Sequence, residues 1–283
     1  MGSKKRVNNL IIVSDLHVGC QLGLCPPKGA RLDEGGRYIP NKGQKKLWKY
    51  WKIFWEEWVP EVCKNEPFAV CLNGDAVDGV HHGSTHQWSH NLEDQHRAAL
   101  EILQPVVEVC EGRYFHIRGT EAHAGISGVD EEKLAYTLGA ISDASGRHAR
   151  YELWWKADRG LAHIMHHIGT SGALHYESTA VMKELSEAYV EAGRWNKEPP
   201  TWLVRSHRHR CVEVRILTNA GFCTASVTAG WQLKTPFAYK VAGGRQTLPQ
   251  IGGTLLRCGD EDLYTRHKIW TIDRPKEEAC YVD

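Results

Sequence analysis

The sequence NNLIIVSDLH, residues 8–17, decides how the chain folds. Its short apolar run predicts a buried strand, and the run ends in Asp15 and His17, with one leucine between them. Side chains alternate faces along an extended segment, so these two are expected to project together from the end of the strand. A carboxylate beside an imidazole begins a metal site, and the rest of the chain has to supply the other ligands.

Four further apolar runs end in the same way. Residues 67–79 end in Asp75 and Asp78, and residues 113–125 end in Glu121 and His123. Residues 161–167 end in His166 and His167, and residues 200–210 end in His207 and His209. Five such runs, alternating with helical segments, predict an α/β layered fold with its ligands at the carboxyl ends of the strands.

Between the first two runs, residues 18–60 hold a polar loop and a tryptophan-rich segment. Trp48, Trp51, Trp55 and Trp58 are spaced as one face of an amphipathic helix, which Pro60 is expected to end. Packing of that face on a sheet is the preferred interpretation, and stacking on nucleobases is the alternative. Further helices are expected at about 92–111, 130–140 and 174–193. Residues 211–283 alternate apolar and polar side chains and predict antiparallel strands.

The composition limits the classes of protein. The 283 residues carry a formal net charge of +1, which gives no general electrostatic reason to bind nucleic acid. Sixteen histidines favour metal chemistry, and nine cysteines without a regular spacing favour free thiols in a reducing cytosol over disulfides. No apolar leader or membrane-length run is visible, so a cytoplasmic protein of one domain, residues 1–283, is expected.

In order, the polar ends of the five runs read D-x-H, G-D-x-x-D, G-T-E-A-H, H-H and S-H-R-H. This series strongly resembles the signature of the calcineurin-like metallophosphoesterase family: D-x-H, G-D-x-x-D, G-N-H-D/E, a lone H, and G-H-x-H. The resemblance covers residues 10–210, and the segments GTEAH and WQLKTPF are most similar to phage and prophage members. It implies a four-layer α/β/β/α sandwich of two mixed sheets flanked by helices, acting in the host cytoplasm if phage-encoded.

The resemblance also implies two divalent metal ions, with manganese foremost and iron, nickel, cobalt or zinc as alternatives. The implied metal ligands are Asp15, His17, Asp75, Glu121, His166, His207 and His209. Asp75 would bridge the two ions. His166 is preferred over His167 because the similar family block places its ligand directly after the apolar strand. A hydroxide bridging the ions would attack phosphorus in line.

The third block departs from the family. The family has an asparagine ligand followed at once by histidine, whereas this chain has Thr120, Glu121 and then, after one alanine, His123. Glu121 is the better substitute ligand because a carboxylate binds such an ion more strongly than a hydroxyl, and a solvated Glu121 is the alternative. His123 would take the family histidine's role at the leaving oxygen, and Asp78 matches the carboxylate that orients it.

The substrate is expected to be a phosphodiester of a nucleic acid or nucleotide. Phosphatases of the family carry an arginine directly after G-D-x-x-D to hold a terminal phosphate, and here that position is Gly79. Candidate phosphate-binding residues are Arg205, Arg208, Arg210, His81 and His82, all of which could instead be solvated charges or hydrogen-bonded loop residues. The low net charge favours short or single-stranded substrates.

Two other classes of function stay open. A metal-dependent phosphomonoesterase, acting on a nucleotide or a phosphoprotein, is the main alternative. A catalytically silent metal-bound interaction protein is the third class. The sequence predicts no particular oligomeric state.

Overall fold

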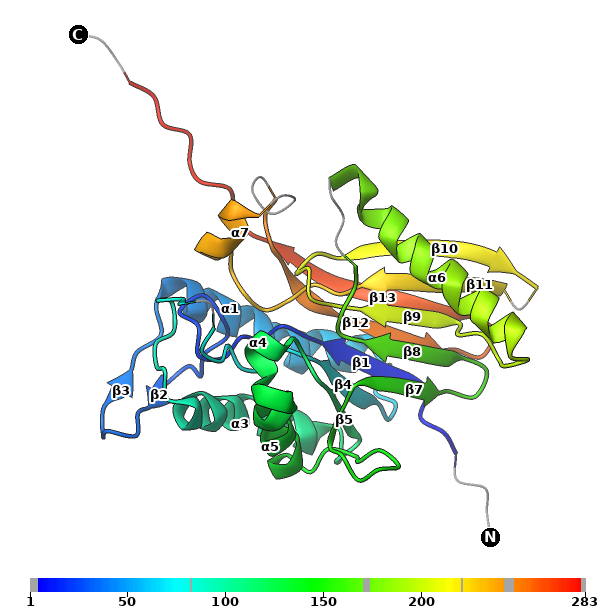
Figure 1. The fold of residues 1–283 in the computed structure, drawn as a ribbon, viewed down its shortest axis with the longest axis horizontal. Coiled ribbons are helices and arrows are strands. Elements are labelled where there is room, and N and C mark those ends of the chain that lie inside the picture. Colours follow the sequence, from blue (N-terminus) through cyan, green and yellow to red (C-terminus); the bar gives the residue numbers. More distant parts are fainter. Residues whose placement is uncertain (1–4, 82, 170–173, 220, 242–246, 281–283) are drawn as a thin grey trace.

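The computed structural model describes residues 5–81, 83–169, 174–219, 221–241 and 247–280. Two large mixed sheets lie face to face, and helices cover the outer face of each (Figure 1). This is the predicted α/β/β/α class, which the structure confirms.

The first sheet has the order β13-β12-β1-β4-β5-β6. Strands β1, β4, β5 and β6 run parallel, while β12 pairs antiparallel with both β1 and β13. The bounds are β1 (Asn9–Val13), β4 (Ala69–Asn73), β5 (Tyr114–Ile117), β6 (Ala149–Arg150), β12 (Gln250–Cys258) and β13 (Leu263–Thr271). The parallel strands carry the first three polar ends to one edge of the sheet.

The second sheet has the order β10-β11-β9-β8-β7. Strands β8, β9 and β11 are parallel to one another, so the last two polar ends also meet at one edge. The bounds are β7 (Glu152–Lys156), β8 (Leu161–Met165), β9 (Trp202–Arg205), β10 (Val212–Thr218) and β11 (Gly221–Val227), and β2 (Ala30–Arg31) and β3 (Arg37–Tyr38) form a separate pair.

The helices form the two outer layers. Those on the first sheet are α1 (Lys42–Ile53), the π-helical turn η1 (Phe54–Trp58), α2 (Val59–Val62), α3 (Leu92–Val109) and α5 (Val129–Thr137). The second sheet is covered by α6 (Glu177–Arg194), and the short turn η3 (Leu174–Tyr176) directly precedes this helix. Short helices α4 (Glu121–Ala124), η2 (Ile126–Gly128) and α7 (Pro236–Lys240) lie in the connecting segments. No helix of the described segments is long and apolar enough to span a bilayer.

Alternation along each strand divides the apolar side chains between two cores. On β1, Ile11 faces the helices while Leu10 and Ile12 face the second sheet, where Trp202 and Ile164 meet them. Both faces of this strand are therefore buried, which explains why the opening sequence reads as a continuous apolar run.

The tryptophan stripe packs on the first sheet, as preferred from the sequence. Trp51 is buried, and Trp48, Trp55 and Trp58 pack against the same core. The prediction that Pro60 ends this helix is wrong, because helical structure continues to Val62. The π-helical turn ends just before, so Pro60 stands in the first turn of a new segment, where a missing N–H is tolerated.

Candidate metal centre

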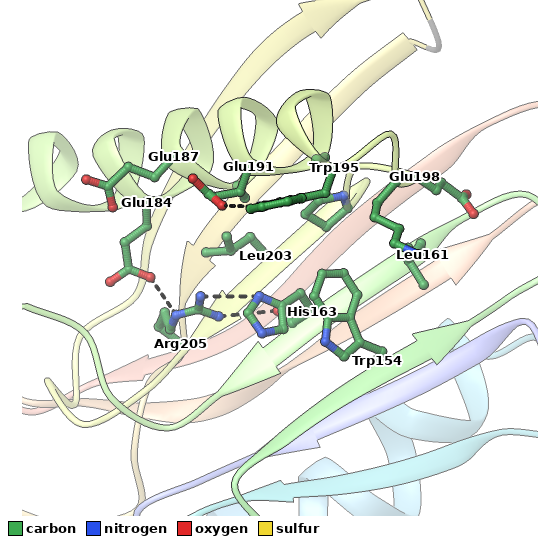
Figure 2. Close-up of a pocket in the computed structure, with 14 residues that line it drawn as sticks. Trp154, Leu161, His163, Glu184, Glu187, Glu191, Trp195, Glu198, Leu203 and Arg205 are labelled. Atoms are coloured by element: carbon green, nitrogen blue, oxygen red, sulfur yellow. Dashed lines mark hydrogen bonds and ion pairs between the residues drawn. The ribbon is translucent and has the colours of Figure 1, made fainter.

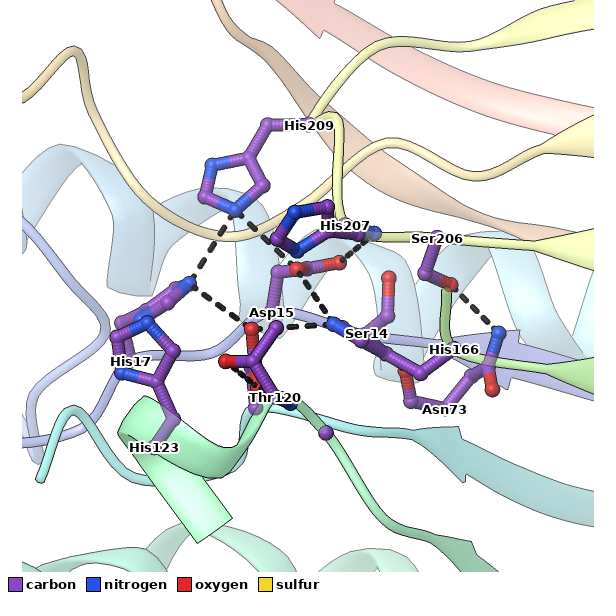
Figure 3. Close-up of polar contacts among 12 residues, drawn as sticks. Ser14, Asp15, His17, Asn73, Thr120, His123, His166, Ser206, His207 and His209 are labelled. Carbon is purple, nitrogen blue, oxygen red and sulfur yellow. Dashed lines mark hydrogen bonds and ion pairs between the residues drawn. The ribbon is translucent and has the colours of Figure 1, made fainter. Parts of the chain in front are cut away.

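The strand ends bend sharply where the polar side chains leave them. Asp15, His17, Asp75, His207 and His209 have φ angles of 56°, 45°, 55°, 71° and 52°, and they are half of the ten non-glycine residues with positive φ in the described segments. Each such bend costs about 1–2 kcal/mol relative to ordinary backbone. Strain of this kind collects at functional sites, and the side chains of Asp15, His17, His207 and His209 gather at one place in Figure 3.

The first cluster joins Asp15, His17 and His209, whose ligand atoms lie within 4.8 Å of one another. His209 Nε2 is 3.2 Å from Asp15 Oδ1 and 3.2 Å from His17 Nε2. Asp75 Oδ2 lies 4.0 Å from His17 Nε2, at the side of the cluster. The structure thus brings together the three residues expected at the first metal, with Asp75 beside them.

The second cluster meets the first at Asp75 Oδ2. His166 Nε2 lies 3.1 Å from Asp75 Oδ2 and 3.9 Å from Asp15 Oδ1. His166 also forms a group with His167 and His207 in which the ligand nitrogens lie within 4.8 Å. Asp75 therefore stands between two sets of imidazoles, which is the position expected of a bridging carboxylate.

His166 and His167 are held differently. His166 is buried, and its Nδ1 donates to the backbone carbonyl of Asn73 at 2.6 Å, which turns Nε2 toward Asp75. A ligating histidine is usually oriented by such a hydrogen bond on its other nitrogen. His167 is exposed and approaches the cluster through His207, with ring centroids 5.3 Å apart.

In the third loop, the structure brings Thr120 rather than Glu121 to the cluster. The Thr120 amide and hydroxyl both donate to Asp75 Oδ1, at 2.8 and 3.2 Å. Glu121 is exposed in the first turn of α4 and belongs to none of the metal-ligating groups of the described residues. The physical reason is that Thr120 is the N-cap of α4, so the chain turns away from the site directly after it.

His123 and Asp78 lie beside the first cluster, but not in the expected pairing. His123 Nδ1 donates to the backbone carbonyl of Asp78 at 2.5 Å. The Asp78 carboxylate instead accepts from His17 Nδ1 at 3.2 Å and approaches His81 Nε2 at 3.5 Å. The His123 ring lies between those of His17 and His81, 4.5 Å from each. Asp78 thus orients one candidate ligand directly and holds His123 through its backbone.

The arginines point away from the cluster. Arg205 is buried on the outer face of the second sheet, where its Nε donates to Glu184 at 2.6 Å. Arg208 donates to the backbone carbonyls of Gly169 and Glu177, and Arg210 pairs with the Glu177 carboxylate at 2.7 Å. The predicted residue His82 lies outside the described residues.

Several supporting residues carried no signal in the sequence. Gln87 is buried and donates to the Asp78 carboxylate at 2.6 Å, and Gln232 approaches the same group at 3.5 Å. Glu131 is fully buried and accepts from the backbone N–H groups of Ala76 and Gly119, at 3.1 and 2.6 Å. Such residues resemble ordinary polar surface in a sequence, and only the fold shows that they face the site.

A chain of hydroxyls lies under the cluster. Asn73 donates to Ser206 Oγ at 2.6 Å (Figure 3). Ser206 meets Thr228 at 2.7 Å, and Thr228 meets Ser14 at 2.8 Å. Asn73 ends β4 and Ser14 follows β1 of the first sheet, whereas the other two follow strands of the second. Ser206, which stands where the family signature has glycine, therefore links the two sheets.

The electrostatics of the site favour bound positive charge. Burial would raise the pKa of the Asp15 and Asp75 carboxyls, but neighbouring histidines, above all His209 for Asp15 and His166 for both, hold them well below the usual range. Burial would lower the pKa of His166, but Asp75 and Asp15 raise it to about 10. Burial and the nearby His166 lower the pKa of His207 to about 4, which leaves a neutral imidazole. Two ionised carboxylates thus lie buried together.

The donor set fits divalent metal ions. The ligand atoms of Asp15, Asp75 and His166 lie within 4.8 Å of one another, and those of Asp15, His17 and His209 form a second such group. Groups as compact as these could each hold one metal ion. Mixed carboxylate and imidazole ligation suits manganese, iron, nickel, cobalt and zinc alike.

No protein-family model matches the chain, and no curated protein matches its sequence. Solved structures that it resembles include Vps29 of Entamoeba histolytica, at 11% identity and a TM-score of 0.35, over 94% of this chain and 99% of that one. The TM1076 protein of Thermotoga maritima has 10% identity and a TM-score of 0.38, over 94% and 100%. The sulfate thiohydrolase SoxB of Thermus thermophilus has 11% and 0.37, over 96% and 58%. Likenesses this distant say nothing about what this chain does.

Proposed function

We propose that this chain is a metal-dependent phosphoester hydrolase with two divalent ions, and that its substrate is a phosphodiester. The observation that carries the proposal is the position of Asp75. It joins one group with His17 and His123 and another with Asp15 and His166. A carboxylate shared by two ligand sets is the arrangement that two-metal hydrolases use. The signature blocks that resemble the calcineurin-like metallophosphoesterases, most of all their phage members, support the same function.

The proposed ligands divide into two sets around Asp75. Asp15, His17 and His209 hold the first ion, and His166, His207 and the Thr120 hydroxyl hold the second. Thr120 takes the place first expected for Glu121, because its hydroxyl lies 3.2 Å from Asp75 Oδ1. Manganese is the ion proposed first. Two bound ions would supply Lewis acidity at the phosphoryl group and lower the pKa of a water molecule toward neutrality.

His123 is proposed to act on the leaving oxygen. Its Nδ1 is committed to the Asp78 carbonyl, so Nε2 is the nitrogen left for a substrate. Burial and the neighbouring His17 lower the pKa of His123, so it needs the negative charge of the substrate to hold a proton. His81, whose ring lies 4.5 Å from that of His123, is the proposed contact to the substrate phosphate.

The environment of Gly79 supports a diester over a monoester. A Cβ atom at this position would lie 2.9 Å from the carbonyl oxygen of Ala122, and the φ of Gly79 is +71°. An arginine that holds a terminal phosphate therefore has no room there. With a net charge of +1, a nucleotide or a short single-stranded nucleic acid is the proposed substrate.

The test compares two chromogenic substrates with manganese supplied: bis-p-nitrophenyl phosphate and its monoester. The diester is expected to be hydrolysed at least tenfold faster, and both activities should disappear in Asp75→Asn. Preference for the monoester would favour a phosphomonoesterase. A protein that binds metal but hydrolyses neither would favour a silent interaction protein, and a protein that binds no metal would refute the proposal.

The cellular location is proposed from the cysteines. All nine are described and none is in a disulfide, and seven of them are buried. Free thiols in this number are typical of a reducing compartment, so we place the protein in the cytoplasm.

A further inference from the structure

A cavity of about 700 Å³ lies on the outer face of the second sheet, beneath helix α6 (Figure 2). Side chains of β7, β8 and β9 form one wall, and α6 with the turn that follows it forms the other. None of the candidate metal ligands lines this cavity. It is therefore separate from the metal centre, and what it binds does not depend on the proposed function.

Two tryptophans expose their rings at this cavity. Trp154 on β7 is 48% exposed, and Trp195 at the end of α6 is 70% exposed. The Trp154 ring stacks on His163, with centroids 4.3 Å apart and planes 12° apart, and the Trp195 indole N–H donates to Glu191 at 2.9 Å. Both rings are thus held in place by a neighbour while their faces remain accessible, which suits an aromatic wall for a ligand.

Carboxylates line the helix side. Glu184, Glu187 and Glu191 are spaced three and four residues apart, which places them on one face of α6, and Glu198 follows beyond the turn. The lining cations are Arg205 and Lys197. Arg205 is buried and paired with Glu184 at 2.6 Å. The remaining charge at the opening is negative, so the cavity disfavours phosphates and other anions.

The other glutamates have only surface partners. Glu187 lies 3.6 Å from Lys183, and Glu191 lies 2.8 Å from Arg194. Glu198 lies 2.5 Å from Lys156. Exposed ion pairs of this kind are weak, so a better-placed cation can replace the lysine or arginine.

We propose that this cavity binds a linear organic polyamine. Ammonium groups would pair with Glu187, Glu191 and Glu198, and the methylene chain would lie across the faces of Trp154 and Trp195. A cation over an aromatic face is attracted by the ring's negative face, most strongly over tryptophan. A wall that alternates carboxylates with indole rings matches a ligand that alternates charge with hydrocarbon.

The test is calorimetric titration of the full chain with spermidine at moderate ionic strength. The wild type should bind one equivalent saturably. The variant Glu187→Gln/Glu191→Gln should bind at least tenfold more weakly, and Trp195→Ala at least fivefold. These side chains are exposed, so the fold should persist, which circular dichroism checks.

The matched control is Glu56→Gln/Glu57→Gln. These two residues are also exposed helical glutamates, and Glu56 lies 3.5 Å from Lys52 in the same i,i+4 arrangement as Glu187 with Lys183. The control removes the same charge elsewhere and should bind like the wild type. Absence of saturable binding would refute the proposal. So would an equal loss in both double variants, or full affinity in Trp195→Ala, because either result means general attraction to surface charge.

Discussion

Asp75 is the residue on which both metal sites depend. It is buried, it lies 3.1 Å from His166, and its Oδ1 accepts both donors of Thr120. Asp75→Asn keeps the shape but removes the shared charge, so we expect the bound metal to fall from about two ions per chain to one or none. Activity should fall by more than about a hundredfold. Elemental analysis and diester hydrolysis measure the two effects.

The control for this prediction is Asp260→Asn, the same change at an exposed loop position. It should retain both metal and activity. Full metal content in Asp75→Asn would mean that the two clusters bind ions without a shared carboxylate.

Thr120 and Glu121 are adjacent in the chain, so variants of the two test which one acts as a metal ligand. The Thr120 hydroxyl touches Asp75, whereas Glu121 is exposed. Thr120→Val preserves the side-chain shape and removes the oxygen, so we expect diester hydrolysis to fall by about 10–100-fold. Glu121→Gln should change it less than about twofold. Both effects are measured as kcat/KM at saturating manganese. If Glu121→Gln lowered kcat/KM more than Thr120→Val did, Glu121 would be the ligand of the second ion instead.

At the scale of elements, α5 supports the site although it supplies none of the candidate metal ligands. Glu131 on α5 accepts the N–H groups of Ala76 and Gly119, which flank Asp75 and Thr120. Glu131→Gln places an amide N–H against one of these donors, in a fully buried position. We expect the free energy of unfolding to fall by about 1–3 kcal/mol and manganese affinity by about tenfold.

Urea unfolding and metal titration measure these two changes. Glu101→Gln, an exposed glutamate on α3, should alter neither. If Glu131→Gln lost stability but kept its metal affinity, α5 would support the fold and not the geometry of the loops.

The elements differ in how well the sequence predicts them. β1, β4, β5, β8 and β9 are apolar runs with a polar end, and each was visible as such. β7 was not predicted, because its side chains alternate between exposed and buried, with Trp154 facing outward, so it does not form a continuous apolar run. The site residues also divide into those that the sequence reveals and those that it does not. The strand-end residues Asp15, Asp75 and His166 were visible, whereas Glu131 and Gln87 lie far from them in the chain and act through tertiary contacts alone.

At the scale of the whole molecule, two polar connections join the sheets. The hydroxyl chain from Ser14 to Asn73 links them under the metal centre. At the edge, His267 on β13 meets Glu213 on β10 at 2.9 Å, and both are edge strands of their sheets. The sequence could not assign strands to one sheet or the other, because an apolar strand face has the same pattern whether it packs between the sheets or under the outer helices.

The edge connection predicts how stability changes with pH. Burial would lower the pKa of His267, but Cys211 and Glu213 raise it to about 9, above the value of about 6.5 for an unfolded histidine. Protonated His267 therefore stabilises the folded state fully below about pH 6.5, and this contribution is lost as pH rises through about 9. Buried thiols weaken the fold in the same range, because burial raises the pKa of groups such as Cys20 to about 12 while unfolded thiols ionise first.

The informative quantity is thus the difference in unfolding free energy between the wild type and His267→Gln. Urea unfolding should show it shrinking by about 1–3 kcal/mol between pH 6 and pH 9.5. A difference that does not change with pH would mean that His267 is neutral in the folded protein and packs without an ion pair.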